Sequence, residues 1–155
     1  MKIQSRRFGT IEIADEDAIR FPQGLIGFPD ETEFVLVPHG NSAVVAWLHS
    51  VKNPVFALPV VSAHGLTDGY AAVVAAQIAA ETGLRDSSAD IAVMAVLSAP
   101  SGKPATVNLL APIVVNATTR MGAQIVLDGT RFTTGEKFVL TNRDPATAER
   151  IAEAG

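Results

Sequence analysis

Residues 106–116, with the sequence TVNLLAPIVVN, constrain the fold of this chain more than any other segment. Every second residue, starting with Val107, is apolar, which is the period of a strand that places one face on a core. The other face carries Asn108, Pro112 and Asn116, and asparagine and proline are poor strand residues. Because Pro112 has no N–H to donate to a sheet, the segment predicts a sheet edge, a bulge or a corner between two strands.

Composition indicates one folded globular domain. The chain has 155 residues, of which 48% are hydrophobic and 18% are charged, and this balance is typical of folded proteins. The absence of cysteine excludes disulfides and thiolate metal sites, and is compatible with the cytoplasm. We expect a β domain over residues 1–143 and a short C-terminal helix or tail over 144–155.

The charge of the chain argues against a nucleic-acid partner, and its hydropathy argues against a membrane segment. Twelve basic and sixteen acidic residues give a formal charge of −4, and no basic run is longer than Arg6-Arg7. Because nucleic acids are bound by concentrated positive charge, we expect no direct binding of nucleic acid. The apolar runs are far shorter than the roughly 20 residues of a membrane helix, and no apolar stretch follows the basic N-terminus. We therefore expect neither a membrane segment nor a signal peptide.

Turn residues recur about every ten positions, with apolar or alternating segments between them. This pattern predicts an all-β, mainly antiparallel fold: a small closed or partly closed β-barrel with one or two short helices. The expected strands are 3–13, 32–37, 43–50, 55–61, 69–74, 91–97, 105–109, 113–116, 123–127 and 137–141. One helix is expected over 75–82, ended by Gly83, and a second is expected to begin at Asp144.

Few residues in the sequence could catalyse a reaction or hold a metal ion. The three histidines, His39, His49 and His64, do not have the spacing of a metal-binding pair. The sequence contains no nucleophile elbow, phosphate loop or dinucleotide fingerprint. We therefore expect no enzymatic activity, no cofactor and no metal site.

Residues 21–29, FPQGLIGFP, form the most distinctive loop of the sequence. Two glycines and two prolines restrict its path, and four large apolar side chains are attached to it. In one interpretation the glycines supply positive φ angles and the apolar side chains plug one end of a barrel. In the other, the same side chains are anchors for a second protein.

Five motifs, in this order along the chain, resemble the flagellar assembly factor FliW family. They are FGTIEI at 8–13, FPQGLIGF at 21–28, LHSVKNP at 48–54, TVNLLAPIVVN at 106–116 and GAQIVL at 122–127. The last two are the most specific. The sequence departs from the family pattern at His49, where glutamine is usual, and at Lys52-Asn53, where acidic residues are common.

The resemblance implies a β-barrel-like domain of the cytoplasm that is not an enzyme. FliW proteins bind flagellin, and they bind CsrA, a small RNA-binding dimer that represses flagellin synthesis. The two partners compete for FliW, so secretion of flagellin frees FliW to relieve the repression. We therefore expect flagellin and a CsrA-type translational regulator as partners, and a monomer when the protein is free.

The residues expected at the partner-binding surface lie in three parts of the sequence. They are Gln23, Gly24, Leu25, Ile26, Gly27 and Phe28 in the loop; His49, Ser50 and Asn53 after the strand; and Asn108 and Asn116, which we expect to be exposed. For the two asparagines, an alternative interpretation is side-chain capping of the backbone at a bend.

Two further hypotheses belong to other functional classes. A small hydrolase or ligand-binding barrel would use His49 and Ser50, but adjacent residues of a strand point to opposite faces, which is wrong for a nucleophile and its base. The other hypothesis is a FliW-like relative with a non-flagellar partner.

Overall fold

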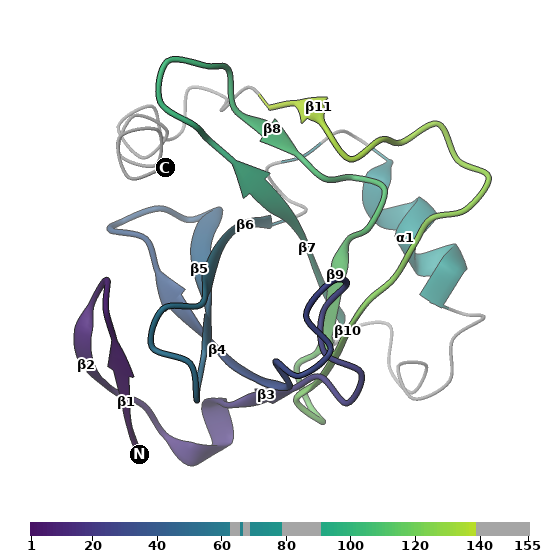
Figure 1. The fold of residues 1–155 in the computed structure, drawn as a ribbon. Helices are drawn as coiled ribbons and strands as arrows, with labels where there is room; N and C mark the ends of the chain where they lie inside the picture. The colour runs from purple at the N-terminus through teal and green to yellow at the C-terminus, as the bar shows by residue number, and fades with distance from the viewer. Residues whose placement is uncertain (63–65, 67–68, 79–90, 139–155) are drawn as a thin grey trace.

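The computed structural model describes residues 1–62, 66, 69–78 and 91–138. Within these residues, seven strands close into a barrel (Figure 1). In order around the wall they are β7 (Ile91–Ser98), β6 (Ala57–Ser62), β5 (Val45–Ser50), β4 (Glu33–Pro38), β3 (Ile19–Arg20), β10 (Met121–Gln124) and β9 (Ile113–Asn116). The ring closes because β9 pairs with both β10 and β7. The predicted fold class, an all-β barrel, is confirmed.

Neighbouring strands of the wall are antiparallel, apart from one pair. β3 and β10 run parallel and meet at Arg20 and Met121. The sequence did not predict β3, which contains only two residues and follows a short 3-10 helix, η1 (Asp15–Asp17). Such a short strand shows no alternation from which it could be recognised.

The N-terminal segment forms a hairpin outside the barrel, so the prediction of one strand over 3–13 was wrong (Figure 1). Its two strands are β1 (Lys2–Ser5) and β2 (Gly9–Glu12). The chain reverses after Ser5, whose Oγ accepts hydrogen bonds from the backbone N–H groups of Arg7 and Phe8 at 3.2 and 3.0 Å. A serine that caps its own turn in this way can end a strand without glycine or proline.

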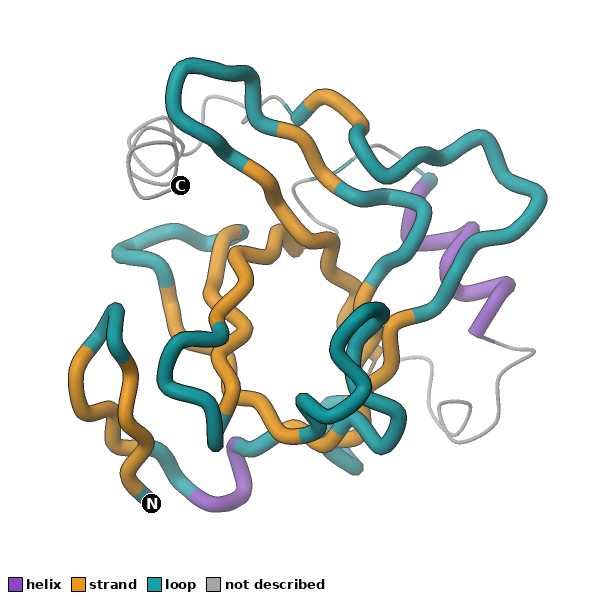
Figure 2. Tube along the Cα trace, viewed as in Figure 1, coloured by secondary structure: helices purple, strands orange, loops and turns teal. Residues whose placement is uncertain are grey.

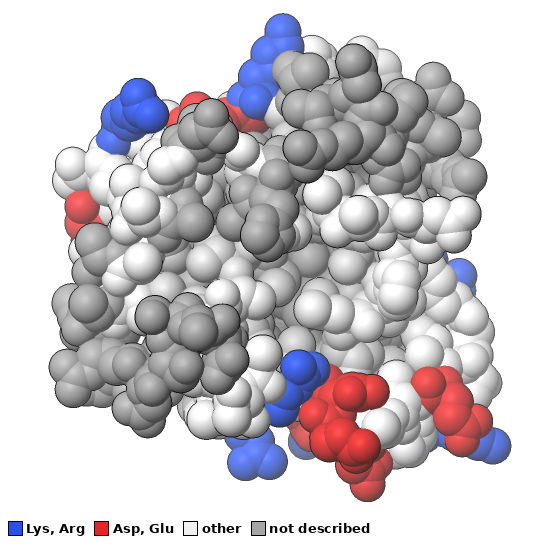
Figure 3. Space-filling view, turned by 180° about the vertical axis from the view of Figure 1, so that it is seen from behind, with Lys and Arg blue, Asp and Glu red and all other residues white. Residues whose placement is uncertain are grey.

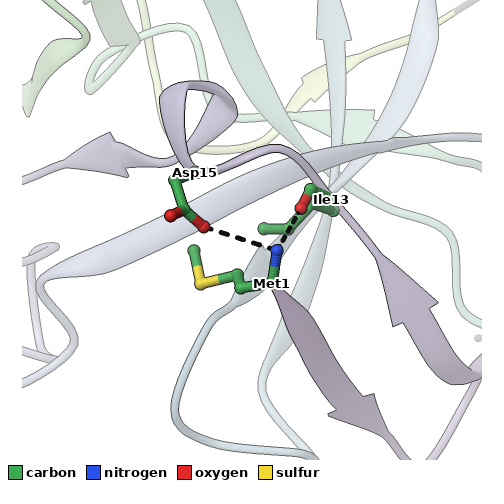
Figure 4. A network of polar contacts seen from close by, with 3 residues as sticks. All are labelled: Met1, Ile13 and Asp15. Carbon is green, nitrogen blue, oxygen red and sulfur yellow. Dashed lines mark hydrogen bonds and ion pairs between the residues drawn. The ribbon is translucent and has the colours of Figure 1, made fainter.

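The first residue is held at the base of this hairpin. The Met1 amino group donates a hydrogen bond to the Ile13 carbonyl at 2.6 Å and lies 3.4 Å from the Asp15 carboxylate (Figure 4). These contacts join the beginning of β1 to the segment that leads into η1.

Residues 106–116 form an interrupted strand along one edge of β7. β8 (Thr106–Val107) pairs with the end of β7, and β9 pairs with its first four residues, from Ile91 to Met94. Residues 108–112 therefore bulge out opposite positions 95 and 96, and Pro112 lies where no ladder donor is needed. Of the three predicted alternatives the structure shows the bulge, and we call residues 108–112 the corner. β11 (Glu136–Lys137) extends the sheet beyond β8.

The helix α1 (Tyr70–Ile78) occupies residues that were predicted to begin with a strand over 69–74, so that prediction was wrong. Tyr70, Val74 and Ile78 recur every four residues on one helical face, and all three are buried. The alanines between them favour the helix. The helix predicted over 75–82 is present over 75–78, and its remainder, with Gly83, lies outside the described residues.

Two clusters of buried side chains lie on the two faces of the barrel wall. Consecutive strand residues alternate between them, because Val60 and Ile113 belong to the inner cluster while Val61 and Val114 belong to the outer one. The inner cluster consists of Ile19, Phe21, Leu25, Phe34, Leu48, Val60, Met94, Ile113 and Val115. The outer cluster packs α1 against the wall, and Figure 1 shows the helix beside β9 and β10.

Most of the remaining predicted strands are present, and others are shortened, shifted or only partly described. Those at 32–37, 43–50, 55–61, 91–97 and 113–116 correspond to β4, β5, β6, β7 and β9. The strand predicted at 105–109 is shortened to β8, and the one predicted at 123–127 lies earlier, as β10. Of 137–141 only the beginning is described, as part of β11, and the helix from Asp144 and the tail 144–155 lie outside the described residues. The domain boundary at 143 stays a prediction.

Candidate partner-binding site

The loop over residues 21–29 contains a tight turn at the end of the barrel nearest the viewer in Figures 1 and 2. The Phe28 N–H donates to the Leu25 carbonyl at 2.8 Å, and the Leu25 N–H donates to the Phe28 carbonyl at 3.1 Å. Gly27 is the third residue of this turn, and its φ of 85° is the positive value that a type II turn requires there. Ile26 and Phe28 are 55% and 47% exposed. The turn therefore presents two large apolar side chains to solvent.

Gly24 allows the two ends of the loop to approach each other closely. Its φ is 68°, and a Cβ at this position would lie 2.5 Å from the Phe28 carbonyl oxygen and 2.6 Å from the backbone of Pro29. No residue with a side chain fits there without movement of the backbone. At Gly27, by contrast, a Cβ would meet nothing within 4 Å. Close packing therefore requires glycine at 24, whereas only the turn conformation favours it at 27.

Phe21 and Leu25 hold the loop from inside the barrel. Both are buried, and the Phe21 ring packs edge-to-face on Phe34 with 5.2 Å between ring centroids. Gly122 on β10 makes room for this ring, because a Cβ there would lie 2.7 Å from it. Both interpretations of the loop are therefore consistent with the structure: some side chains plug the barrel and others face outward. Gly24 and Leu25, which were expected at the partner-binding surface, are buried, and their part in partner binding stays a prediction.

Gln124 connects the turn to the corner of residues 108–112. Its Oε1 accepts a hydrogen bond from the Ile26 N–H at 2.9 Å, and its Nε2 donates to the Ala111 carbonyl at 3.0 Å. The Ala111 N–H donates in turn to Asn108 Oδ1 at 3.0 Å. Gln124 was not predicted as a site residue, and its place in the motif at 122–127 was the only signal in the sequence.

A second loop, residues 51–56, packs against the turn. The rings of Phe28 and Phe56 meet edge-to-face, with 4.7 Å between their centroids. Phe56 is half-buried and also contacts the inner cluster. We call Ile26, Phe28 and Phe56 the apolar cap. Gln23, another predicted site residue, is exposed in the same loop as the turn.

Glu31 fixes the position of the second loop. Its Oε1 accepts a hydrogen bond from the Ser50 hydroxyl at 2.7 Å, and its Oε2 accepts one from Asn53 Nδ2 at 2.9 Å. Ser50 Oγ accepts further hydrogen bonds from the N–H groups of Lys52 and Asn53. Ser50 is buried, so its observed contacts are structural. Glu31 was not predicted as a site residue, because a carboxylate in an acidic turn resembles an ordinary exposed residue.

His49 is buried on the opposite face of β5 and holds the hairpin. Its Nδ1 lies 2.7 Å from the Ser50 carbonyl and donates to it, because a carbonyl can only accept. Its Nε2, 2.8 Å from Ser5 Oγ, then accepts a hydrogen bond from that hydroxyl. Ser50 Oγ is bonded to Glu31 instead, so the structure does not bring His49 and Ser50 together as the base and nucleophile of a hydrolase.

Asn108 and Asn116 cap bends of the backbone. Asn116 Oδ1 accepts hydrogen bonds from the N–H groups of Thr118 and Thr119 at 2.9 and 3.1 Å, and Asn108 Oδ1 accepts the one from Ala111. Asn116 is 1% exposed and Asn108 is half-buried, so the expectation that both are exposed was wrong. These contacts match the capping interpretation. The structure therefore brings the turn and residues 50–56 together, and leaves Asn108 at the corner of residues 108–112 and Asn116 at the end of β9.

The described part of the chain shows neither a metal site nor a membrane-spanning helix. No group of three or more His, Asp or Glu side chains in this part could hold a metal ion. No helix described here is long and apolar enough to cross a membrane. Burial raises the pKa of the Tyr70 hydroxyl, which lies in the outer cluster and donates a hydrogen bond to the Leu109 carbonyl at 2.8 Å.

Comparisons with known proteins identify relatives over most of the chain. The family model described as FliW protein matches residues 2–138. The flagellar assembly factor FliW of Moorella thermoacetica is 37% identical over 136 residues, which cover 86% of this chain and 85% of that protein. The protein of the same name from Heliobacterium modesticaldum is 35% identical over 139 residues, which cover 89% and 90% of the two chains.

A solved structure has the same architecture. The crystal structure of a flagellar assembly factor FliW superposes with a TM-score of 0.68 at 28% sequence identity. The match covers 88% of this chain and 96% of that one.

Proposed function

This chain belongs to the FliW family of flagellar assembly factors, and we propose that it acts without catalysis, by binding flagellin and antagonising a CsrA-type translational regulator in the cytoplasm. The motif resemblance supports these two partners. Because they would compete for one protein, secretion of flagellin would release it to act on the regulator. The rate of flagellin synthesis would thereby rise when flagellin is exported.

The proposal rests on the apolar cap, whose exposed side chains are attached to a backbone that hydrogen bonds hold in place. Ile26 and Phe28 are large, apolar and about half exposed, as anchors of a protein interface are before the partner arrives. The backbone beneath them is held by the reciprocal hydrogen bonds of the turn and by Gln124. A surface that is already ordered loses little entropy on binding, so more of the contact energy appears as affinity.

The charge of the chain suits a basic partner. The formal charge is −4. Acidic side chains gather near the lower edge of the face seen from behind in Figure 3. A regulator that binds RNA must carry a concentrated positive face, so attraction between unlike charges would speed its encounter with this protein.

Calorimetric titration against the two partners from the same host tests the proposal. We expect a dissociation constant in the micromolar range or tighter for flagellin and for the regulator, and displacement of the regulator when flagellin is added. A small RNA-binding protein of similar charge, but of another family, controls for attraction by charge alone. Absence of binding to both partners at micromolar concentrations would refute the proposal.

A further inference from the structure

A cavity lies where the N-terminal hairpin meets the loop of residues 51–56. Its volume is about 240 Å³, and it is lined by Arg6, Arg7, His49, Pro54, Val55 and Ala57. Val55, which precedes Phe56 of the cap, is 62% exposed. The cavity therefore combines two cationic side chains with an apolar wall.

The two arginines at this cavity form no ion pair with an acidic residue of the described part of the chain. The salt bridge found in the described part of the chain joins Met1 and Asp15, and it involves neither Arg6 nor Arg7. The Arg7 guanidinium lies over the Trp47 ring, 4.3 Å from its centroid. Stacking of this kind fixes the plane of a guanidinium and leaves the N–H groups on its edge available to an acceptor.

The backbone that carries these arginines is fixed on the barrel. The Arg6 N–H donates to the Pro54 carbonyl at 2.8 Å, and the preceding residue, Ser5, is bonded to His49. The Phe8 ring packs edge-to-face on Trp47, with 5.9 Å between centroids. Both ring nitrogens of His49 are used in hydrogen bonds, so the arginines supply the free donors of the cavity.

We propose that this cavity binds a carboxylate side chain of the protein partner, whose neighbouring apolar residue packs on Val55. A guanidinium presents paired N–H donors that match the two oxygens of a carboxylate. The apolar wall of Pro54, Val55 and Ala57 suits a polypeptide segment better than a free phosphate, which has no apolar part. The inference rests on the proposed function, because it assumes that the partner is a protein.

Trp47 reports on this cavity through Arg7, whose guanidinium lies over its ring, and it is the only tryptophan of the chain. The probe is N-acetyl-aspartyl-leucinamide, titrated while the fluorescence of Trp47 is recorded, with the asparaginyl analogue as the neutral control. We expect a saturable change with the acidic dipeptide only. Equal responses to the two dipeptides, or saturation by inorganic phosphate at lower concentration than by the acidic dipeptide, would overturn the inference.

Arg6→Gln tests the role of the cation without disturbing the arginine that stacks on the reporter. Because a hydrogen bond to a charged group is lost, we expect the dipeptide affinity to fall by about tenfold or more. Arg131→Gln is the matched control, since Arg131 is an exposed arginine, as Arg6 is, and does not line the cavity. Equal affinities of the two variants would contradict the inference.

The same two variants separate this inference from the proposed function. If the unmodified chain binds flagellin or the regulator and Arg6→Gln binds each as tightly as Arg131→Gln does, the carboxylate site is wrong and the proposed function stands. If the unmodified chain binds neither partner but the acidic dipeptide saturates the cavity, the proposed function fails alone. Unchanged melting temperatures would show that both variants are folded, as expected for exposed side chains.

Discussion

At the scale of single residues, Gly24 and Gly27 have similar backbone angles and different surroundings. Both have positive φ, but only Gly24 lies against the backbone of Phe28 and Pro29. The sequence alone indicates that both glycines belong to a turn. It could not indicate which of them is required by close packing, because that contact exists only when the loop has folded on itself.

We expect Gly24→Ala to lower the free energy of unfolding by about 3 kcal/mol, the sum of left-handed strain and a clash with backbone. Gly27→Ala should lower it by only about 1 kcal/mol, because strain is its only cost. Urea denaturation of the two variants measures the difference. Equal losses would contradict the close approach at Gly24.

Two residues that support the candidate site could not be predicted for a related reason. Gln124 and Ile26 are 98 positions apart in the sequence, and Glu31 and Ser50 are 19 apart. Local spacing gives no information about such pairs, since the barrel must close before they meet. The predicted residues Ile26 and Phe28 are exposed because they belong to a tight turn, which is a local property.

At the scale of elements, the errors of prediction occur where a local pattern fits two structures. The run from 69 to 74 is apolar throughout, and a short apolar run does not distinguish a buried strand from a buried helix. The spacing of Tyr70, Val74 and Ile78 was the better signal, because it continues past the run. The corner of residues 108–112 was predicted correctly, because proline restricts the structure at its own position.

The attachment of α1 has a consequence at alkaline pH. Burial raises the pKa of Tyr70, so ionised tyrosine is favoured in the unfolded chain, where its pKa is near 10. The folded state therefore holds the proton more tightly, and stability falls as the pH rises above about 10. We expect tyrosinate absorbance to appear together with unfolding, and Tyr70 is the only tyrosine that can produce it.

Tyr70→Phe provides the control for this prediction. It removes the hydrogen bond to the Leu109 carbonyl, which should lower stability at neutral pH by about 1 kcal/mol. The difference between the variant and the unmodified chain should then shrink as the pH rises above about 10. Tyrosinate absorbance in a chain that is still folded just above that pH would show that the hydroxyl is accessible to solvent.

At the scale of the whole molecule, the barrel has two different ends. The loop of residues 21–29 closes one of them and presents the apolar cap there. At the other end, where β4 leads into β5, an apolar cavity of about 470 Å³ is lined by residues that include Leu36, Val60 and Met94. We assign partner binding to the capped end, because hydrogen bonds of the turn, Gln124 and Glu31 hold its backbone in place.

Flagellin binding by a pair of matched variants tests this assignment most directly. Ile26→Ser removes an exposed anchor of the cap, and Leu36→Ser removes an exposed apolar side chain, 39% accessible, at the other end. In calorimetric titrations with flagellin, we expect Ile26→Ser to weaken binding at least about tenfold, as the loss of an interface anchor does, and Leu36→Ser to leave it unchanged. Unchanged binding by Ile26→Ser, with loss in Leu36→Ser, would contradict the account and place the partner at the opposite end of the barrel.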